Sequence, residues 1–301
     1  MENPVSKHLV SIRVAATLAA TLFTALGAQA ADPPKTACEQ CATWNAPHKP
    51  FKIYGNTYYV GVHGLTSVLI TSKQGHVLID GALGESVPQI AASIQALGFR
   101  VEDVKLILNT HDHFDHAGGI AELQKLSGAT VAALAPSAKV LEQGASGTDD
   151  PQYGQLLPIS KVKSVRVLKD GETVRVGDLA LTAHSTPGHT PGGTSWTWKS
   201  CESSRCLNMV YVDSLSPISF EGFKFSSNKT YPNALADFEK SFTTISSLPC
   251  DVLISPHPEV SNLFARIESG NGLIDATACK RYVEMFRGRL KKRLEEESAS
   301  R

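Results

Sequence analysis

Short apolar runs separated by turn residues recur along the chain from Phe51 onward, and they predict β-strands. In the first half, strands are expected at residues 52–54, 57–62, 66–71, 76–81, 104–109 and 129–134. The second half repeats the pattern, with strands expected at residues 164–168, 172–176, 179–183, 194–198, 208–212 and 251–255. Ahead of them, residues 31–50 are rich in Pro, Ala and Cys and predict an irregular arm.

Helical periodicity marks a second class of segment. Ile90, Ile94 and Leu97 lie at helical spacing in a segment that begins at Glu85 and stops at Gly98. Further helices are expected at residues 120–126, 136–141, 235–248 and 276–297. Two successive strand-rich halves, each with helices, predict an α/β fold in which two mixed β-sheets pack face to face with helices on the outside. Because the halves would share one core, we expect a single domain over residues 31–301.

One long segment interrupts this pattern. Residues 144–158 are dominated by Gly, Ser, Asp and Pro, and they predict a loop. A loop of this length in a compact domain more often serves as a lid or a binding loop than as a simple connection. A shorter turn is expected at Asp170 and Gly171, where it would join strand 164–168 to strand 172–176.

The N-terminus has the three parts of a secretory signal peptide. Lys7 and Arg13 make a basic start, residues 14–26 form an apolar run too short to span a bilayer comfortably, and Ala28 and Ala30 supply small residues before a cleavage site. We therefore expect residues 1–30 to be removed and the mature protein to be periplasmic. A retained membrane anchor is the alternative.

Composition limits the partners. The chain has 301 residues with 29 basic and 29 acidic side chains, so its formal net charge is zero and nothing suggests a polyanion such as nucleic acid as a partner. A hydrophobic fraction of 42% is ordinary for a globular protein with a sizeable core. We expect no nucleic-acid partner, no membrane association of the mature form, and a monomer.

All six cysteines lie in the mature part, and an even number in an exported chain favours disulfides. The short loop between Cys201 and Cys206 makes them the safest pair. A bond between Cys250 and Cys279 would tie the last strand region to the last helix. Cys38 and Cys41 would then pair with each other by subtraction only. A zinc or redox site at this Cys-x-x-Cys motif is the alternative.

Candidate chemistry is concentrated at one turn between an expected strand and an expected helix. Four potential metal ligands, His111, His113, Asp115 and His116, lie there within six residues. His111 and His113 are close enough to share one ion, whereas the adjacent Asp115 and His116 point differently and can serve a second. Imidazole and carboxylate ligands together suit Zn²⁺. A solvated polar turn explains three histidines at this spacing poorly, because the chain has only ten.

Two remote histidines have the same setting, since His189 lies in a Pro/Gly turn after strand 179–183 and His257 directly follows strand 251–255. These loops would bring six ligands together in two groups, namely His111, His113 and His189 on one metal and Asp115, His116 and His257 on the other. Each ion would then have three protein ligands and an open position, which is typical of catalytic zinc. Water between two such ions becomes a hydroxide nucleophile, and Asp115 is the candidate residue to orient it.

The order His111-x-His113-x-Asp115-His116, then His189, then His257, resembles the metallo-β-lactamase superfamily. The resemblance covers about residues 50–290 and implies an αββα fold. Ser214 stands where other di-zinc subclasses carry a ligand cysteine, and residues 187–198 are similar to subclass B3 enzymes. The chain therefore resembles subclass B3 in particular.

This resemblance implies zinc-dependent hydrolysis of penicillins, cephalosporins and carbapenems, with two zinc ions per chain and antibiotic resistance as the result. It implies that the first zinc polarises the ring carbonyl attacked by the hydroxide, and that the second stabilises the nitrogen anion released. Ser214 and Ser216 occupy positions that B3 enzymes use for the substrate carboxylate, although a polar turn is the alternative for Ser216. Some B3 relatives pair an N-terminal cysteine with one in the segment at residues 62–65, which here has none, so a local bond through Cys41 would fasten the arm.

Asp213 leaves an alternative open. It lies 24 residues after His189 at a strand end, and in hydroxyacylglutathione hydrolases and other superfamily hydrolases an aspartate in this region bridges both metals. A thioesterase or lactonase is therefore the first alternative, although the signal peptide argues against a cytoplasmic glutathione thioester as substrate. A metal-storing or structural zinc protein is the second, and the open coordination positions argue against it.

Overall fold

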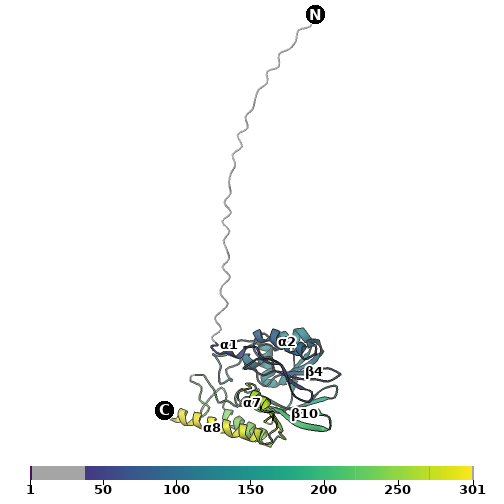
Figure 1. The fold of residues 1–301 in the computed structure, drawn as a ribbon. Helices are drawn as coiled ribbons and strands as arrows, with labels where there is room; N and C mark the ends of the chain where they lie inside the picture. Colours follow the sequence, from purple (N-terminus) through teal and green to yellow (C-terminus); the bar gives the residue numbers. More distant parts are fainter. Residues whose placement is uncertain (2–37, 221, 271, 300–301) are drawn as a thin grey trace. The chain divides into compact units, whose positions relative to one another are not determined.

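The computed structural model describes Met1 and residues 38–299, apart from residues 221 and 271. The expected signal peptide, Met1 excepted, lies outside the described residues, as does the domain boundary expected at residue 31. The helices and strands among the described residues all belong to one compact unit that begins at Cys38. They form two β-sheets with helices on the outer faces (Figure 1).

The first sheet contains seven strands in sequence order. They are β1 (Phe51–Tyr54), β2 (Thr57–Tyr59), β3 (Val68–Ile70), β4 (His76–Ile79), β5 (Val104–Leu108), β6 (Thr130–Leu134) and β7 (Val165–Leu168). Strands β1 to β4 pair antiparallel, and β4 to β7 pair parallel. The sheet is therefore mixed, as expected.

The second sheet contains five strands in the order β12-β11-β10-β9-β8. Their bounds are β8 (Thr173–Val176), β9 (Leu179–Ser185), β10 (Thr194–Glu202), β11 (Arg205–Tyr211) and β12 (Val252–Ile254). Only the β11–β12 pair is parallel among the pairings of this sheet. In both sheets, parallel strands end at the same edge, and the loops that follow β5, β11 and β12 start from such edges.

Three apolar layers hold the molecule together. Leu106 and Leu108 of β5 lie in the core between the sheets, whereas Ile107 lies in the core beneath the outer helices. In the same way Tyr211 of β11 faces the central core and Val210 faces the helices on the other side. Strands buried on both faces need nearly continuous apolar runs, which is the pattern seen in the sequence.

Helices cover both outer faces. Helices α2 (Val87–Ala96), α4 (Ile120–Ser127) and α5 (Ala135–Gln143) pack on the first sheet, and α6 (Ala234–Ser247) and α8 (Ala278–Ala299) pack on the second. Figure 1 shows α2 and α8 on opposite sides of the paired sheets. The αββα sandwich expected from the sequence is thus confirmed, and so are its five expected helices, with small shifts at their ends. None of the helices among the described residues is long and apolar enough to cross a membrane.

Short elements were not predicted. Helices α1 (Cys41–Trp44), α3 (Phe114–Ala117) and α7 (Leu263–Glu268), and the 3₁₀ turns Gly84–Ser86 and Val101–Asp103, are each too short to show a helical period.

Two connections also differ from the expectation. Strands β10 and β11 continue through Cys201 and Cys206, which face each other in the hairpin, so the expected loop there is paired strand. The turn at Asp170 and Gly171 joins β7 to β8, but these strands lie in different sheets, so this turn is the crossover between the two layers.

Three disulfides join the same cysteines that the sequence analysis paired. Cys201–Cys206 lies across the β10–β11 hairpin, and Cys250–Cys279 ties the start of β12 to α8. The third, Cys38–Cys41, closes the start of α1, so the Cys-x-x-Cys is a disulfide here rather than a zinc site. This bond joins residues only three apart, and the contact of this segment with the domain is made by the backbone N–H groups of His63 and Gly64, which donate to the carbonyls of Ala46 and Trp44 at 2.8 and 2.9 Å.

A carboxylate of α8 holds the loop that follows β11. Glu297 is 4% exposed, and its two oxygens accept hydrogen bonds from the backbone N–H groups of Phe225 and Ser226, at 2.8 and 2.9 Å. The guanidinium of Arg293, which lies 3.1 Å from Glu297, also donates to Oγ of Ser219. Burial alone would raise the pKa of Glu297, but the two backbone N–H donors and Arg293 lower it below its usual value.

We predict that Glu297→Ala lowers the free energy of unfolding by about 2 kcal/mol at neutral pH, because one buried and one partly buried backbone N–H group lose a charged acceptor. Since the pKa of Glu297 is lowered from 4.5, its contribution is complete above pH 4.5 and is lost as the pH falls through the lowered pKa. Chemical denaturation at several pH values measures this. The matched control is Glu284→Ala, at an exposed position of the same helix. Equal losses in both variants would contradict the assignment.

Candidate metal centre

The turn after β5 places four candidate ligands. His113 has extended backbone angles, φ −70° and ψ 152°, and directly precedes α3, which carries Asp115 and His116. The N–H groups of His116 and Ala117 donate to the carbonyl of His113, at 3.0 and 2.8 Å, and so close the helical turn. Together with His111, these residues are at most 8% exposed. The sequence motif thus becomes a compact, buried cluster.

A buried aspartate that the sequence analysis missed fixes this turn. Asp80 follows β4 with a left-handed backbone, φ 64°, and its carboxylate accepts from the N–H and Oγ1 of Thr110, at 2.7 and 2.9 Å. The hydroxyl of Tyr211 donates to it from the second sheet, at 2.7 Å. Burial raises the pKa of Asp80 to about 6, although these donors favour its ionised form. The signal for this role was a lone carboxylate at the end of an apolar strand.

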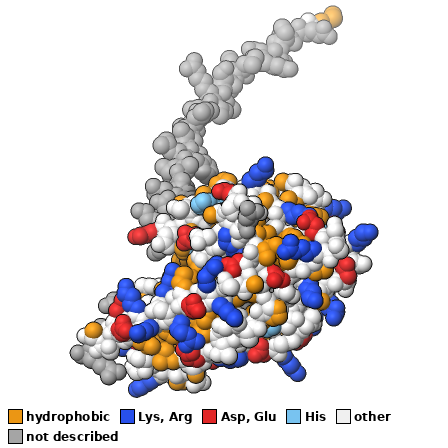
Figure 2. Space-filling view, turned by 60° about the horizontal axis from the view of Figure 1, so that its bottom comes forward, with side chains coloured by type: hydrophobic (Ala, Val, Ile, Leu, Met, Phe, Trp, Pro, Cys, Tyr) orange, Lys and Arg blue, Asp and Glu red, His pale blue; other side chains and the backbone are white. Residues whose placement is uncertain are grey.

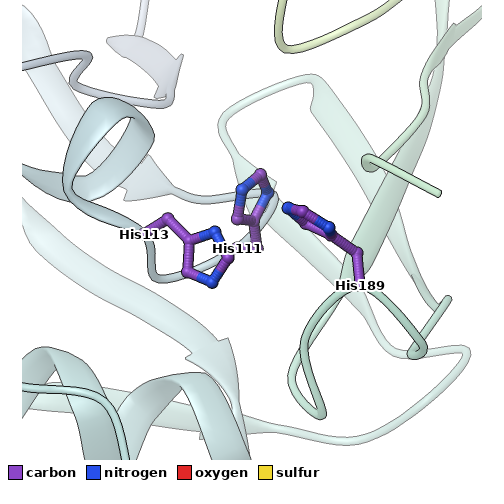
Figure 3. Close-up of side chains that lie close together, drawn as sticks. All are labelled: His111, His113 and His189. Atoms are coloured by element: carbon purple, nitrogen blue, oxygen red, sulfur yellow. The ribbon is translucent and has the colours of Figure 1, made fainter. Parts of the chain in front are cut away.

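The loop between β9 and β10 brings His189 to this turn. The preceding Gly188 has φ 136°, and a Cβ there would lie 2.7 Å from the ring of Phe238, so only glycine fits. The ring centroids of His111, His113 and His189 form a nearly equilateral triangle with sides of 4.8, 4.9 and 4.8 Å. Figure 3 shows the three rings converging on one space, and their nitrogens are near enough to share an ion.

A second ligand group is centred on Asp115. Its Oδ2 lies 3.2 Å from Nε2 of His116 and 3.4 Å from Nε2 of His257, which follows β12. Two ligand atoms bound to one tetrahedral zinc at about 2.0–2.1 Å are roughly 3.3 Å apart, so the distances from Asp115 to each histidine suit an ion shared with Asp115. His111 also lies within 4.8 Å of the Asp115 and His116 ligand atoms. The two groups are therefore neighbours.

Four of the five imidazoles have one ring nitrogen held by a hydrogen-bond partner outside the cluster. The contacts are His111 Nδ1 to Asp213 Oδ1 at 2.8 Å, His113 Nε2 to Asp150 Oδ2 at 2.9 Å, His189 Nδ1 to the Ser216 carbonyl at 2.8 Å, and His257 Nδ1 to the Gly64 carbonyl at 3.1 Å. Each contact fixes a ring and leaves its opposite nitrogen to bind a metal, as in other histidine metal sites. This arrangement fits Zn²⁺.

The protonation states of His111, His189 and Asp115 also suit metal binding, whereas Asp150 raises the pKa of His113 and Asp115 raises that of His257. Burial, with the neighbouring imidazoles, holds the pKa of His111 well below its usual value and lowers that of His189 to about 3, so both are neutral. Burial would raise the pKa of Asp115, but His116 and His257 outweigh it and hold that pKa well below its usual value. Neutral imidazoles and an ionised carboxylate are the forms that coordinate metal ions.

Comparison with known proteins identifies the family. The chain matches the Metallo-beta-lactamase superfamily over residues 60–202. It is 57% identical to Rm3 metallo-beta-lactamase, with a TM-score of 0.85, over 87% of this chain and 99% of that one. It is 52% identical to MEM-A1, a subclass B3 metallo-beta-lactamase isolated from a soil metagenome library, with a TM-score of 0.84, over 86% of this chain and 100% of that one. The chain belongs to subclass B3 of the metallo-β-lactamases.

Hydroxyacylglutathione hydrolases are more distant relatives of this B3 metallo-β-lactamase. The enzyme of Rhodopseudomonas palustris is 35% identical over 129 residues, which are 40% of this chain and 41% of that protein. The chain spans 41% to 59% of the length of the first three curated relatives that it matches. Such partial matches support the superfamily rather than a shared substrate.

Asp213, the residue behind the thioesterase alternative, lies behind the ring of His111. It is fully buried, its Oδ1 is 2.8 Å from Nδ1 of His111, and its backbone N–H donates to Oγ of Ser195. The structure thus places Asp213 against the outer nitrogen of His111, and its role as an orienting residue rather than a ligand between two metals stays a prediction.

Ser214 and Ser216 lie on the segment that directly follows β11. The Ser216 carbonyl is 2.8 Å from Nδ1 of His189, which places this segment beside the first ligand group. Ser214 is 8% exposed, and its Oγ accepts from the backbone N–H of Ser216 at 3.3 Å, which leaves its own hydroxyl proton to donate. Contact of either serine with substrate stays a prediction.

We predict that Asp213→Ala weakens zinc binding at the first site by about 10- to 100-fold, because His111 loses the acceptor that orients it. Competition with a chromophoric chelator measures both zinc affinities, with Asp178→Ala, at an exposed position, as the control. The second affinity should change little. A comparable loss at both sites would instead favour a bridging ligand.

Proposed function

We propose that this protein hydrolyses the β-lactam ring of penicillins, cephalosporins and carbapenems in a zinc-dependent reaction, and so confers antibiotic resistance. The observation that carries the proposal is the pair of adjacent ligand groups, buried except for the partly exposed His257, in which four imidazoles have their outer nitrogens held. Its B3 relatives support the same activity, since the chain covers 99% and 100% of the two described above.

In this proposal the ligand groups hold two zinc ions, one on His111, His113 and His189 and the other on Asp115, His116 and His257. When bound, the ions would supply Lewis-acid sites and lower the pKa of the attacking water. Asp115 is the catalytic residue on the protein side. Its Oδ2 faces His116 and His257, so Oδ1 is free to accept a hydrogen bond from that water and to orient it.

The compartment belongs to the same proposal. Three disulfides support an oxidising environment, and with the expected signal peptide they indicate a periplasmic enzyme. We infer a monomer that acts on a small molecule without a nucleic-acid partner. Figure 2 is consistent with the lack of a nucleic-acid partner, because Lys and Arg side chains are interspersed with Asp and Glu on the face it shows.

The test is carbapenem hydrolysis by the purified mature protein, measured before chelation, after chelation and after zinc is restored, with a glutathione thioester assayed in parallel. We expect zinc-dependent carbapenem loss and no thioesterase activity. Asp115→Ala should lower kcat by about 10²- to 10⁴-fold with an unchanged circular dichroism spectrum. Thioester hydrolysis without carbapenem hydrolysis would reassign the substrate, and full activity after chelation would contradict the metal mechanism.

We further predict that Ser214→Ala raises KM for β-lactams while kcat changes little, because a hydroxyl donor near the substrate carboxylate contributes mainly to binding. A removed hydrogen bond to a charged group is worth about 1.5–3 kcal/mol, which corresponds to roughly a 10- to 100-fold rise. Steady-state kinetics measure the change, with Ser226→Ala, further along the same segment, as the control. A KM equal to that of the wild type would remove Ser214 from the substrate site.

A further inference from the structure

One carboxylate joins the long loop at residues 144–158 to the first ligand group. Asp150 is 3% exposed, although its neighbour Asp149 is exposed to solvent. Its Oδ2 lies 2.9 Å from Nε2 of His113, and its Oδ1 accepts from the backbone N–H of Gln152 at 2.7 Å. Oδ2 of Asp150 therefore orients the imidazole of His113, while Oδ1 stabilises the conformation of the loop.

A second loop is tied to the same ligand group by its backbone. The carbonyl of Ser216, in the segment at residues 213–220, lies 2.8 Å from Nδ1 of His189. Four residues further on, the N–H of Phe220 donates to the carbonyl of Pro151 at 2.8 Å. The two loops are thus hydrogen-bonded to each other, and each is also bonded to a different imidazole of the first group.

These contacts form a continuous series, and a metal ion would join its two ends into a closed circuit. The series runs from His113 to Asp150 and Pro151, crosses to Phe220, and returns through Ser216 to His189. The remaining gap is between the imidazoles of His113 and His189, whose centroids are 4.8 Å apart. An ion bound to both would complete the circuit.

We propose that Asp150 is a positioning residue that couples occupation of the first metal site to the order of the two loops at residues 144–158 and 213–220. The proposal rests on the zinc-binding part of the proposed function. Zinc on Nδ1 of His113 requires that Nε2 keep its proton and donate it to Asp150, so metal binding strengthens that contact. By thermodynamic linkage, the factor by which bound zinc favours the ordered loops equals the factor by which ordered loops raise the affinity for zinc.

Asp150 is better placed for this role than Asp112 and Asp149, two other carboxylates that lie near it or near His113. Asp112 is buried next to His113 in the chain, but its Oδ1 accepts from Oγ of Ser137 at 2.7 Å, which ties it to α5 instead. Asp149 has the same charge as Asp150 and is adjacent to it, but it is exposed. Asp149→Asn is therefore a matched control for loss of charge in this loop.

The experiment measures hydrogen–deuterium exchange of both loops in the full mature protein, with and without zinc, alongside zinc affinity by chelator competition. In the wild type and in Asp149→Asn, zinc should slow exchange at residues 144–158 and 213–220. In Asp150→Ala, zinc should no longer slow it, and first-site affinity should fall by about 10- to 100-fold. Asp150→Asn keeps one acceptor oxygen and should give an intermediate result, which serves as the test if the alanine variant does not fold.

Three results would overturn the proposal. The first is zinc that binds to Asp150→Ala with wild-type affinity and protects the loops as before, and the second is zinc that binds to the wild type and leaves loop exchange unchanged. A purely structural role would raise exchange equally with and without zinc, which also contradicts coupling. Failure of the proposed function is distinguishable, because a protein that shows zinc-dependent loop protection but hydrolyses no β-lactam would contradict the substrate assignment alone.

Discussion

The site depends on the hydrogen bonds that hold the outer nitrogens of its histidines. Four buried imidazoles, the partly exposed His257 and a carboxylate share one cluster, and burial of such groups is costly unless each has a partner. Asp213, Asp150 and the carbonyls of Ser216 and Gly64 supply four of those partners. They also select the nitrogen that each ring presents to a metal. The same contacts thus offset the cost of burial and prepare the coordination geometry.

The fold supplies these partners from many parts of the chain. Strand β5 leads into the turn with His111 and His113, β12 leads to His257, and β11 leads to Asp213 and Ser216. Asp80, which follows β4 of the first sheet, accepts hydrogen bonds from Thr110 in the ligand turn and from Tyr211 of the second sheet. The sandwich with its three apolar cores therefore holds in place the loops that carry the site, because the loops by themselves would not be rigid.

The sequence predicted the layers and the ligands better than their supports. Strands such as β5 and helices such as α6 were predictable because burial on one or two faces leaves a periodic or continuous apolar pattern. The six candidate ligands could be named because metal chemistry restricts residue type and spacing, and the structure brings their side chains together. Asp150 was not predictable, since its partner His113 lies 37 residues away in the sequence and only the folded chain brings them together. The direction in which Asp213 points was likewise undetermined, because either orientation is compatible with a strand end.

The most direct test of this account is a crystal structure of the zinc-loaded protein with anomalous scattering at the zinc edge. We expect two ions, the first bound by Nε2 of His111, Nδ1 of His113 and Nε2 of His189, with Asp213 still on Nδ1 of His111. A zinc ion ligated by the Asp213 carboxylate, or by one of the ring nitrogens that hydrogen bonds hold in this structure, would contradict it.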